Sequence, residues 1–99
     1  MNYTHEREFE WNEAKSESCF RSRGFDFEYV SMAFGDRNRL VWQDLRFQYG
    51  EPRYQMLGKI QDRVFAVAYT PRFNKLRIIS AHKANLREVA QYENSVEVD

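Results

Sequence analysis

Val64-Phe65-Ala66-Val67-Ala68-Tyr69 is the stretch that decides the fold, because its residues are apolar almost without a break. A strand that is covered on both faces has this composition, since neither of its sides meets water. The stretch therefore predicts the central strand of a sheet with other elements packed on both sides.

Further strand-like segments lie on both sides of this stretch, and the connections between them are short. The segments are Leu40 to Trp42, Tyr54-Gln55-Met56-Leu57-Gly58-Lys59-Ile60 and Leu76 to Ala81, with turns at Gln61-Asp62-Arg63 and Pro71-Arg72-Phe73-Asn74-Lys75. Because short connections join antiparallel neighbours, we expect an antiparallel sheet.

Helix signals occupy the two ends of the chain. Glu8-Phe9-Glu10-Trp11 alternates like a first strand, and Asn12 is a good N-cap for a helix from Glu13 to about Ser22, which Gly24 would stop. Asp26 can cap a second short helix ending near Gly35, and Asn85 a last helix reaching Tyr92. The sequence thus predicts an α+β fold of order βααββββα, with helices packed on the antiparallel sheet.

The length of 99 residues fits one domain with one core. Apolar residues make up 42% of the chain and aromatic residues 16%, so aromatic side chains should fill that core. We expect a single domain over residues 8–93, with polar, flexible ends at residues 1–7 and 94–99.

Cysteine and histidine are too few for a disulfide or a zinc cluster. The chain has one cysteine, Cys19, and two histidines, so we expect a metal-free protein without a cofactor in a reducing compartment. No apolar run approaches the roughly 20 residues that cross a bilayer, and Met1 to Glu10 is too polar for a signal peptide. These features predict a cytoplasmic protein without membrane contact.

The net charge is zero, which disfavours a stand-alone nucleic-acid binder. The charges are unevenly distributed, however. From Arg72 to Arg87 the chain has cations and no acid. One face of the molecule is therefore expected to be basic.

An apolar strand leads into a cluster of cations at His82. Arg77 and Lys83 can neutralise charge on a phosphoryl group, and the helix that begins near Asn85 directs free amides toward an anion. Histidine titrates near neutral pH, so His82 can act as a general acid or base. The alternative is that Arg77 and Lys83 are solvated strand-end cations and that His82 is structural.

The alternation of side chains along a strand separates these residues. Arg77 and Lys83 share one face of an ideal strand, and His82 points to the other. Arg77 and His82 meet in one site only if the strand bulges or ends before His82.

Tyr49-Gly50-Glu51-Pro52-Arg53-Tyr54 is the second candidate region. Glu51 can serve as a base and Arg53 as a bidentate phosphate clamp, although the two can also form a simple surface pair. Arg23 is a third cation, of a kind that commonly complements a helix end. Trp42, Phe65 and the other aromatic residues have core spacing, with a base-stacking platform as the minor alternative.

Several blocks of sequence, taken together, resemble one known family. The blocks are Phe9-Glu10-Trp11-Asn12-Glu13-Ala14-Lys15, Gly24-Phe25-Asp26-Phe27-Glu28, Tyr49-Gly50-Glu51-Pro52-Arg53-Tyr54 and Arg77-Ile78-Ile79-Ser80-Ala81-His82-Lys83-Ala84, followed by Arg87-Glu88 and Tyr92-Glu93. In order and spacing they are similar to BrnT toxins over nearly the whole chain. The resemblance implies a RelE-like fold, RNA cleavage that stops translation, and a BrnA-type antitoxin through which alone operator DNA is contacted.

The resemblance also directs attention to particular residues. Lys83, Tyr54, Arg87 and Tyr92 become candidates for substrate binding. The family usually has Lys-His-Gly where this chain has Ser22-Arg23-Gly24, and an Arg in place of His82. If Arg23 and His82 face each other, a His and Arg pair is preserved with its positions exchanged.

The leading hypothesis is a metal-independent endoribonuclease with candidate catalytic residues His82, Arg77, Glu51, Arg53 and Arg23. A base would activate the ribose 2′-hydroxyl, and Arg77 and Arg53 would stabilise the developing charge. The products would be a 2′,3′-cyclic phosphate and a 5′-hydroxyl. The alternative is a non-catalytic subunit that binds the antitoxin and tunes promoter repression.

Overall fold

The computed structural model describes residues 8–96 and has the predicted order of elements. These are β1 (Glu8–Trp11), α1 (Glu13–Arg23), α2 (Phe27–Val30), η2 (Ser31–Gly35), β2 (Leu40–Gln43), β3 (Tyr54–Ile60), β4 (Arg63–Arg72), β5 (Lys75–Lys83) and α3 (Leu86–Ser95). Helix α3 continues past the expected boundary at residue 93. Residues 1–7 and 97–99, most of the two expected flexible ends, lie outside the described residues.

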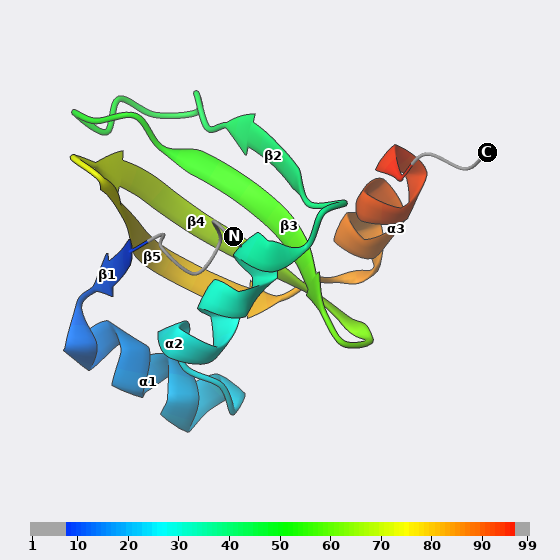
Figure 1. Ribbon diagram of the computed structural model, residues 1–99, viewed down its shortest axis with the longest axis horizontal. Coiled ribbons are helices and arrows are strands. Elements are labelled where there is room, and N and C mark those ends of the chain that lie inside the picture. The colour runs from blue at the N-terminus through cyan, green and yellow to red at the C-terminus, as the bar shows by residue number, and fades with distance from the viewer. Residues whose placement is uncertain (1–7, 97–99) are drawn as a thin grey trace, which may run out of the picture.

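The strands form one sheet in the order β1-β5-β4-β3-β2, with β4 at its centre as predicted (Figure 1). Strands β2 to β5 pair antiparallel, but β1 pairs parallel with β5, so the sheet is mixed and the expectation of a purely antiparallel sheet was too simple. The reason is the connection. Helices α1 and α2 separate β1 from the next strand, so no hairpin imposes an antiparallel partner on it.

Short polar side chains start the helices where the sequence predicts them. Asn12 accepts a hydrogen bond from the Lys15 amide at 3.0 Å, and Asp26 accepts one from the Tyr29 amide at 2.8 Å. Gly24 ends α1 with a φ of 87°, a left-handed conformation that glycine adopts without a Cβ clash. These three assignments are confirmed. No helix in the described part of the chain is long and apolar enough to span a bilayer.

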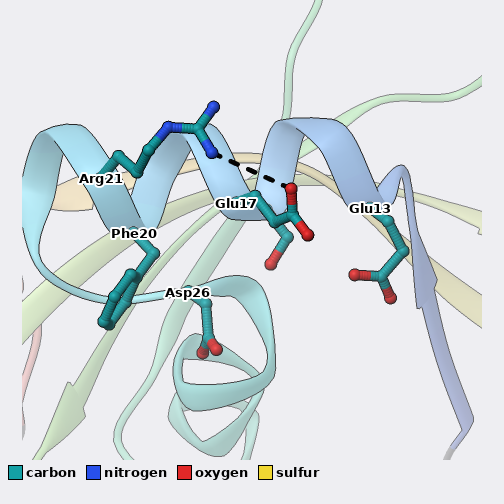
Figure 2. A pocket seen from close by; sticks show the side chains of 6 residues that line it. Glu13, Glu17, Phe20, Arg21 and Asp26 are labelled. Atoms are coloured by element: carbon teal, nitrogen blue, oxygen red, sulfur yellow. Dashed lines mark ion pairs between the residues drawn. The ribbon is translucent and has the colours of Figure 1, made fainter.

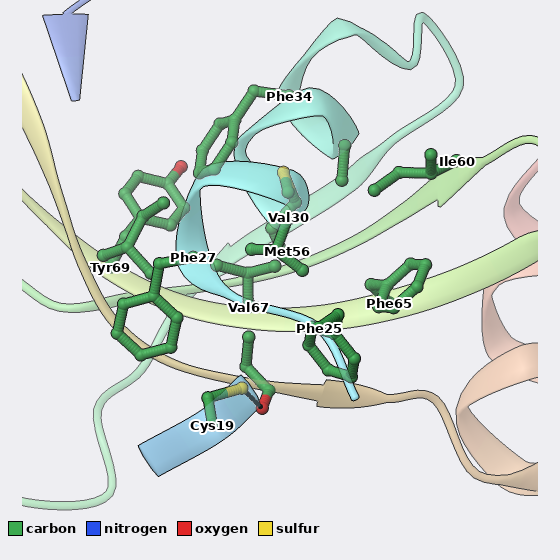
Figure 3. Close-up of a cluster of buried hydrophobic side chains, with 13 residues drawn as sticks. Cys19, Phe25, Phe27, Val30, Phe34, Met56, Ile60, Phe65, Val67 and Tyr69 are labelled. Carbon is green, nitrogen blue, oxygen red and sulfur yellow. Dashed lines mark hydrogen bonds between the residues drawn. The ribbon is translucent and has the colours of Figure 1, made fainter. Parts of the chain in front are cut away.

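One face of the sheet, here called the core face, lies under α1, α2 and η2 and carries the aromatic core (Figure 3). The Phe65 ring packs edge-on against Phe25, with centroids 5.0 Å apart. A Cβ added at Gly58 would lie 2.7 Å from the carbonyl oxygen of Ala33, so glycine is what lets η2 approach β3. The expected aromatic core is therefore confirmed on this face.

Helix α3 covers one half of the opposite face of the sheet. Tyr92 of α3 belongs to a second buried cluster with Leu57 and Ala66. Its hydroxyl donates a 2.6 Å hydrogen bond to Asp36, and burial together with this bond raises the pKa of Tyr92 to about 12. The capping box between Asn85 and Glu88 fixes the start of α3. Within residues 8–96, no helix covers the other half of this face.

Candidate functional site: the open half of the sheet

A bulge in β5 changes which side chains of this strand point to the same face of the sheet. Ala68 pairs with Ser80 and Tyr69 with Ile78, so Ile79 is an extra residue without a partner on β4. An extra residue shifts the alternation of all later side chains by one. Strand β5 therefore bulges before His82, which is the condition for Arg77 and His82 to share a face.

The cross-strand partners identify that face. Arg77 pairs with Thr70, and His82 pairs with Ala66, and both partners alternate away from the core residues Val67 and Tyr69. Ser80 lies between them and is exposed. Arg77, Ser80 and His82 consequently share the face opposite the aromatic core.

Four side chains form a row across this face. Trp42 pairs with Gln55, Gln55 with Ala68, and Ala68 with Ser80. Trp42 is 38% exposed, and Gln55 is partly exposed. We call this row, together with Arg77, the open half of the sheet.

Asp44 anchors the loop that borders the open half. Its carboxylate accepts hydrogen bonds from the Arg46 amide and guanidinium, from the Tyr49 hydroxyl at 2.9 Å and from the Gln55 amide at 3.1 Å. The Arg46 guanidinium is the main cause that holds the pKa of Asp44 far below its usual range. The side chain of Asp44 is only 2% exposed, so its carboxylate is a buried charge that holds the surrounding loop residues through hydrogen bonds.

Arg53 and Glu51 lie next to this anchor. The Arg53 guanidinium stacks over the Tyr49 ring, 4.0 Å from its centroid. Glu51 accepts a hydrogen bond from Arg72 at 3.2 Å and lies 3.9 Å from Arg53. Nε of Arg53 is buried and has no hydrogen-bond partner among the described residues. Two cations thus pair with Glu51.

Arg77 is held at the edge of the sheet by a partner on β1. Its guanidinium lies 3.3 Å from the carboxylate of Glu10, and both side chains are about 30% exposed. This pair orients Arg77 beside Ser80 and still leaves part of the guanidinium open to solvent.

His82 is held by the start of α3. Its Nε2 lies 3.1 Å from Oε1 of Glu88, the same oxygen that accepts the Asn85 amide in the capping box. A carboxylate only accepts hydrogen bonds, so Nε2 is the donor in this pair, and in a neutral imidazole Nδ1 is then the acceptor. An imidazole that is oriented by a carboxylate is the arrangement that general bases use.

The other sequence candidates lie elsewhere. Lys83 pairs with Phe65, so the bulge that brings Arg77 and His82 to one face sends Lys83 to the other. Tyr54 stacks on Tyr69 at the core face, with centroids 5.7 Å apart. Arg87 is exposed in the first turn of α3. None of these three lies in the row across the open half.

Two further expectations do not fit the structure. Tyr92 is 3% exposed and its hydroxyl is bound to Asp36, so it cannot reach a substrate. Arg23 lies at the end of α1, on the core-face side, and no hydrogen bond or ion pair joins it to His82 within residues 8–96. The helix hydrogen bonds of α1 and its packing against β5 decide the position of Arg23, and an exchanged His and Arg pair is not formed.

Arg23 contacts Cys19 and not His82. The Cys19 thiol is buried beside the Ala81 carbonyl, 3.8 Å from it, and burial raises its pKa, with a hydrogen bond from Arg23 acting in the opposite direction. A thiol in this state is a packing group and a weak nucleophile.

A hollow between α1 and the start of α2 is separate from the open half (Figure 2). Glu13, Glu17 and Asp26 line it with Phe20 and Arg21, and Arg21 is paired with Glu17 at 3.9 Å. Carboxylates dominate its lining, so it repels phosphate and is not a candidate for RNA binding.

Several site residues were missed by sequence reasoning. Trp42 was placed in the core because of its spacing, and Asp44, Gln55 and Ser80 were not singled out. The alternation in β2 gives Trp42 two possible faces, and only the pairing with Gln55 selects one. Among the described residues, no group of three or more His, Cys, Asp or Glu could hold a metal ion.

The chain is a small α+β protein with a mixed sheet. One face of the sheet is packed with aromatic side chains, and the other carries arginines, a tryptophan and a histidine held by a carboxylate. The model of the family described as the ribonuclease toxin BrnT of type II toxin-antitoxin systems matches residues 11–88, which include both His82 and Glu88. The chain belongs to this family, and the resemblance seen in the sequence is confirmed. No curated protein matches it. An RNA substrate and an antitoxin partner follow from the family's description.

Proposed function

We propose that this protein cleaves RNA on the open half of its sheet. The observation that carries the proposal is the bulge at Ile79, which puts Arg77, Ser80 and His82 on one face. A strand of RNA laid along β5 meets a guanidinium, a hydroxyl and an oriented imidazole in succession. Arg53 is at the neighbouring end of β3, over Tyr49.

The chemistry is an attack of the ribose 2′-oxygen on the adjacent phosphorus. His82 Nδ1 takes the 2′-hydroxyl proton, the new oxygen–phosphorus bond forms, and the bond to the 5′-oxygen breaks. The departing oxygen takes a proton from water, which gives a 2′,3′-cyclic phosphate and a 5′-hydroxyl. Arg77, together with Arg53, stabilises the charge that develops on the phosphoryl oxygens.

No metal takes part in this scheme. The support is that three carboxylates around the open half already have cationic partners: Asp44 has Arg46, Glu51 has Arg72, and Glu10 has Arg77. A carboxylate that is neutralised in this way is a poor ligand for magnesium. The arginines supply the positive charge that a metal would otherwise bring.

In the cell, we propose that RNA cleavage in the cytoplasm stops translation until a BrnA-type antitoxin neutralises the protein. The antitoxin, not this chain, contacts the operator. The support is the sequence resemblance and the family's description as a type II toxin, together with the zero net charge, which disfavours independent DNA binding.

The test is an assay of the purified chain on a single-stranded RNA, carried out with and without EDTA. We expect cleavage in both samples and cyclic phosphate ends by mass spectrometry. Loss of cleavage with EDTA, restored by Mg²⁺, would disprove the metal-free scheme. A folded protein that binds antitoxin and cleaves no RNA would support the non-catalytic alternative.

A further inference from the structure

The loop between β2 and β3 ends in large side chains that are open to solvent. Leu45 is 78% exposed and Phe47 is 67% exposed, and the side chain of Arg46 between them is 68% exposed. Exposed apolar residues in a group require an explanation, because folding gains nothing from them.

This tip is nevertheless fixed in place. Arg46 donates to Asp44 through its backbone amide at 3.1 Å, through Nε at 2.9 Å and through Nη2 at 2.7 Å. The Asp44 amide in turn donates to the Arg53 carbonyl at 2.7 Å, which extends the pairing of β2 with β3 into the loop. The exposed side chains are thus presented by an ordered loop.

Planar groups follow one another from the tip to the sheet. The guanidinium of Arg46 lies 5.9 Å from the Phe47 centroid, and the Phe47 ring meets Tyr49 edge-on at 5.8 Å. Tyr49 carries the guanidinium of Arg53 at 4.0 Å. Two cations and two aromatic rings therefore form a ladder that starts in solvent at Phe47 and ends beside the open half.

We propose that this ladder binds unpaired bases of single-stranded RNA, with Phe47 as the residue on which a base stacks. Every nucleobase has a flat π-face, so an exposed ring binds it without regard to sequence, and arginines beside the ring bind the neighbouring phosphates. Asp44 is the positioning residue, since it holds Arg46 and Tyr49 together. This inference rests on the proposed function, and it assigns to the ladder the binding of the RNA bases next to the cleaved bond.

The ladder is connected to the open half by a direct contact. Asp44 accepts a 3.1 Å hydrogen bond from Gln55, the residue that pairs with Trp42 in the row across the sheet. An RNA strand held at Phe47 is thereby directed onto Trp42 and Gln55 and toward Ser80. The mixture of guanidinium and aromatic groups favours RNA over an apolar protein segment. The Arg46 side chain is 68% exposed while it is bound to Asp44, so it can contact a phosphate, which an apolar segment does not offer.

The experiment measures binding of a short single-stranded 2′-O-methyl RNA, which cannot be cleaved because its 2′-oxygen is blocked. Phe47→Ala should weaken binding about five- to a hundredfold, the range for loss of one stacked base. Phe20→Ala is the matched control, because Phe20 is also exposed, at 57%, but lies on α1 at the acidic hollow. It should leave binding unchanged.

Two further measurements separate stacking from charge. A 2-aminopurine in the RNA should lose fluorescence on binding to the parent protein and keep it with Phe47→Ala. An RNA duplex has no free base faces, so its weaker binding should not change with Phe47→Ala. Asp44→Asn, which keeps the shape but removes the charge that holds Arg46, should weaken single-strand binding while leaving the protein folded.

Equal single-strand affinity of Phe47→Ala and the parent, with RNA cleavage intact in both, would overturn the ladder and leave the proposed function standing. Failure of the parent to bind or cleave any RNA would overturn both. If Phe47→Ala cleaved RNA normally and only escaped neutralisation by the antitoxin, the tip would be a protein contact and the inference would be wrong.

Discussion

The two faces of the sheet have the same strands but different tasks. The core face meets α1, α2 and η2 and buries Phe65 and Val67, with Val67 at 0% exposure. On the opposite face, α3 covers only the half around Leu57 and Ala66, and Ser80 and Trp42 remain accessible. Alternation along each strand lets one face hold the fold together and frees half of the other for a substrate.

The comparison shows how little separates a structural position from a functional one. Ser80 and Ala81 are neighbours in β5, yet Ala81 is 2% exposed in the core and Ser80 is exposed on the open half. The bulge at Ile79 decides which of these two neighbours is buried and which is exposed. Changes at adjacent positions should therefore have effects of different kinds.

The largest expected effect is that of Ala81→Asp, which buries an unpaired carboxylate on the core face. Such a change costs about 4 kcal/mol or more, a large part of the stability of a small domain. We expect no cooperative thermal unfolding by circular dichroism. Ser80→Asp, the same substitution one residue away, should remain folded and lose RNA affinity because its charge repels phosphate. If both variants fold equally well, the two faces are not distinct in the way described.

The next largest effect is expected on catalysis. His82→Ala should reduce the cleavage rate about 10²- to 10⁴-fold, the range for a general acid or base, with the protein still folded. Arg23→Ala should cleave at close to the parent rate, because Arg23 lies on the core-face side. The rates are compared on one RNA substrate. If Arg23→Ala is as impaired as His82→Ala, the two act in one site, and if His82→Ala is fully active, Glu51 should be tested as the base.

The covered half of the second face gives a smaller, pH-dependent effect. Tyr92→Phe removes the hydrogen bond to Asp36 and should lower the free energy of unfolding by about 1.5–3 kcal/mol near neutral pH. The folded-state pKa of Tyr92 is raised from 10.0 to about 12, so its contribution is complete below pH 10 and is lost as pH rises toward 12. The difference between the two proteins in urea unfolding should shrink over that window. A difference that stays constant to pH 12 would contradict the assignment.

The smallest effect should distinguish two cations on one strand. Arg77→Ala should weaken RNA binding and reduce the slope of log affinity against log salt by about 1, as expected for loss of one phosphate contact. Lys75→Ala is the control, because Lys75 pairs with Glu8 at the far end of β5, away from Ser80. Equal slopes for Arg77→Ala and the parent protein would remove Arg77 from the RNA surface.

Much of the fold could be predicted from local signals. The caps Asn12, Asp26 and Asn85 start their helices as expected, since each cap bonds an amide within a few residues. The central strand and its two hairpin neighbours follow from apolar runs and short turns. Candidates Arg77, Arg53 and His82 came from residue type and position, and the structure keeps all three beside the open half.

What the sequence alone determined is the set of elements, their order and the family, because these depend on contacts between near neighbours and on motifs in fixed order. The parallel pairing of β1, the extra residue Ile79 and the exposed side of Trp42 depended on partners far along the chain. A one-residue shift exchanges the two faces of a strand, and no local signal marks it. Tertiary pairing therefore decided that His82 joins Arg77 on one surface, that Lys83 does not, and that Tyr92 is buried.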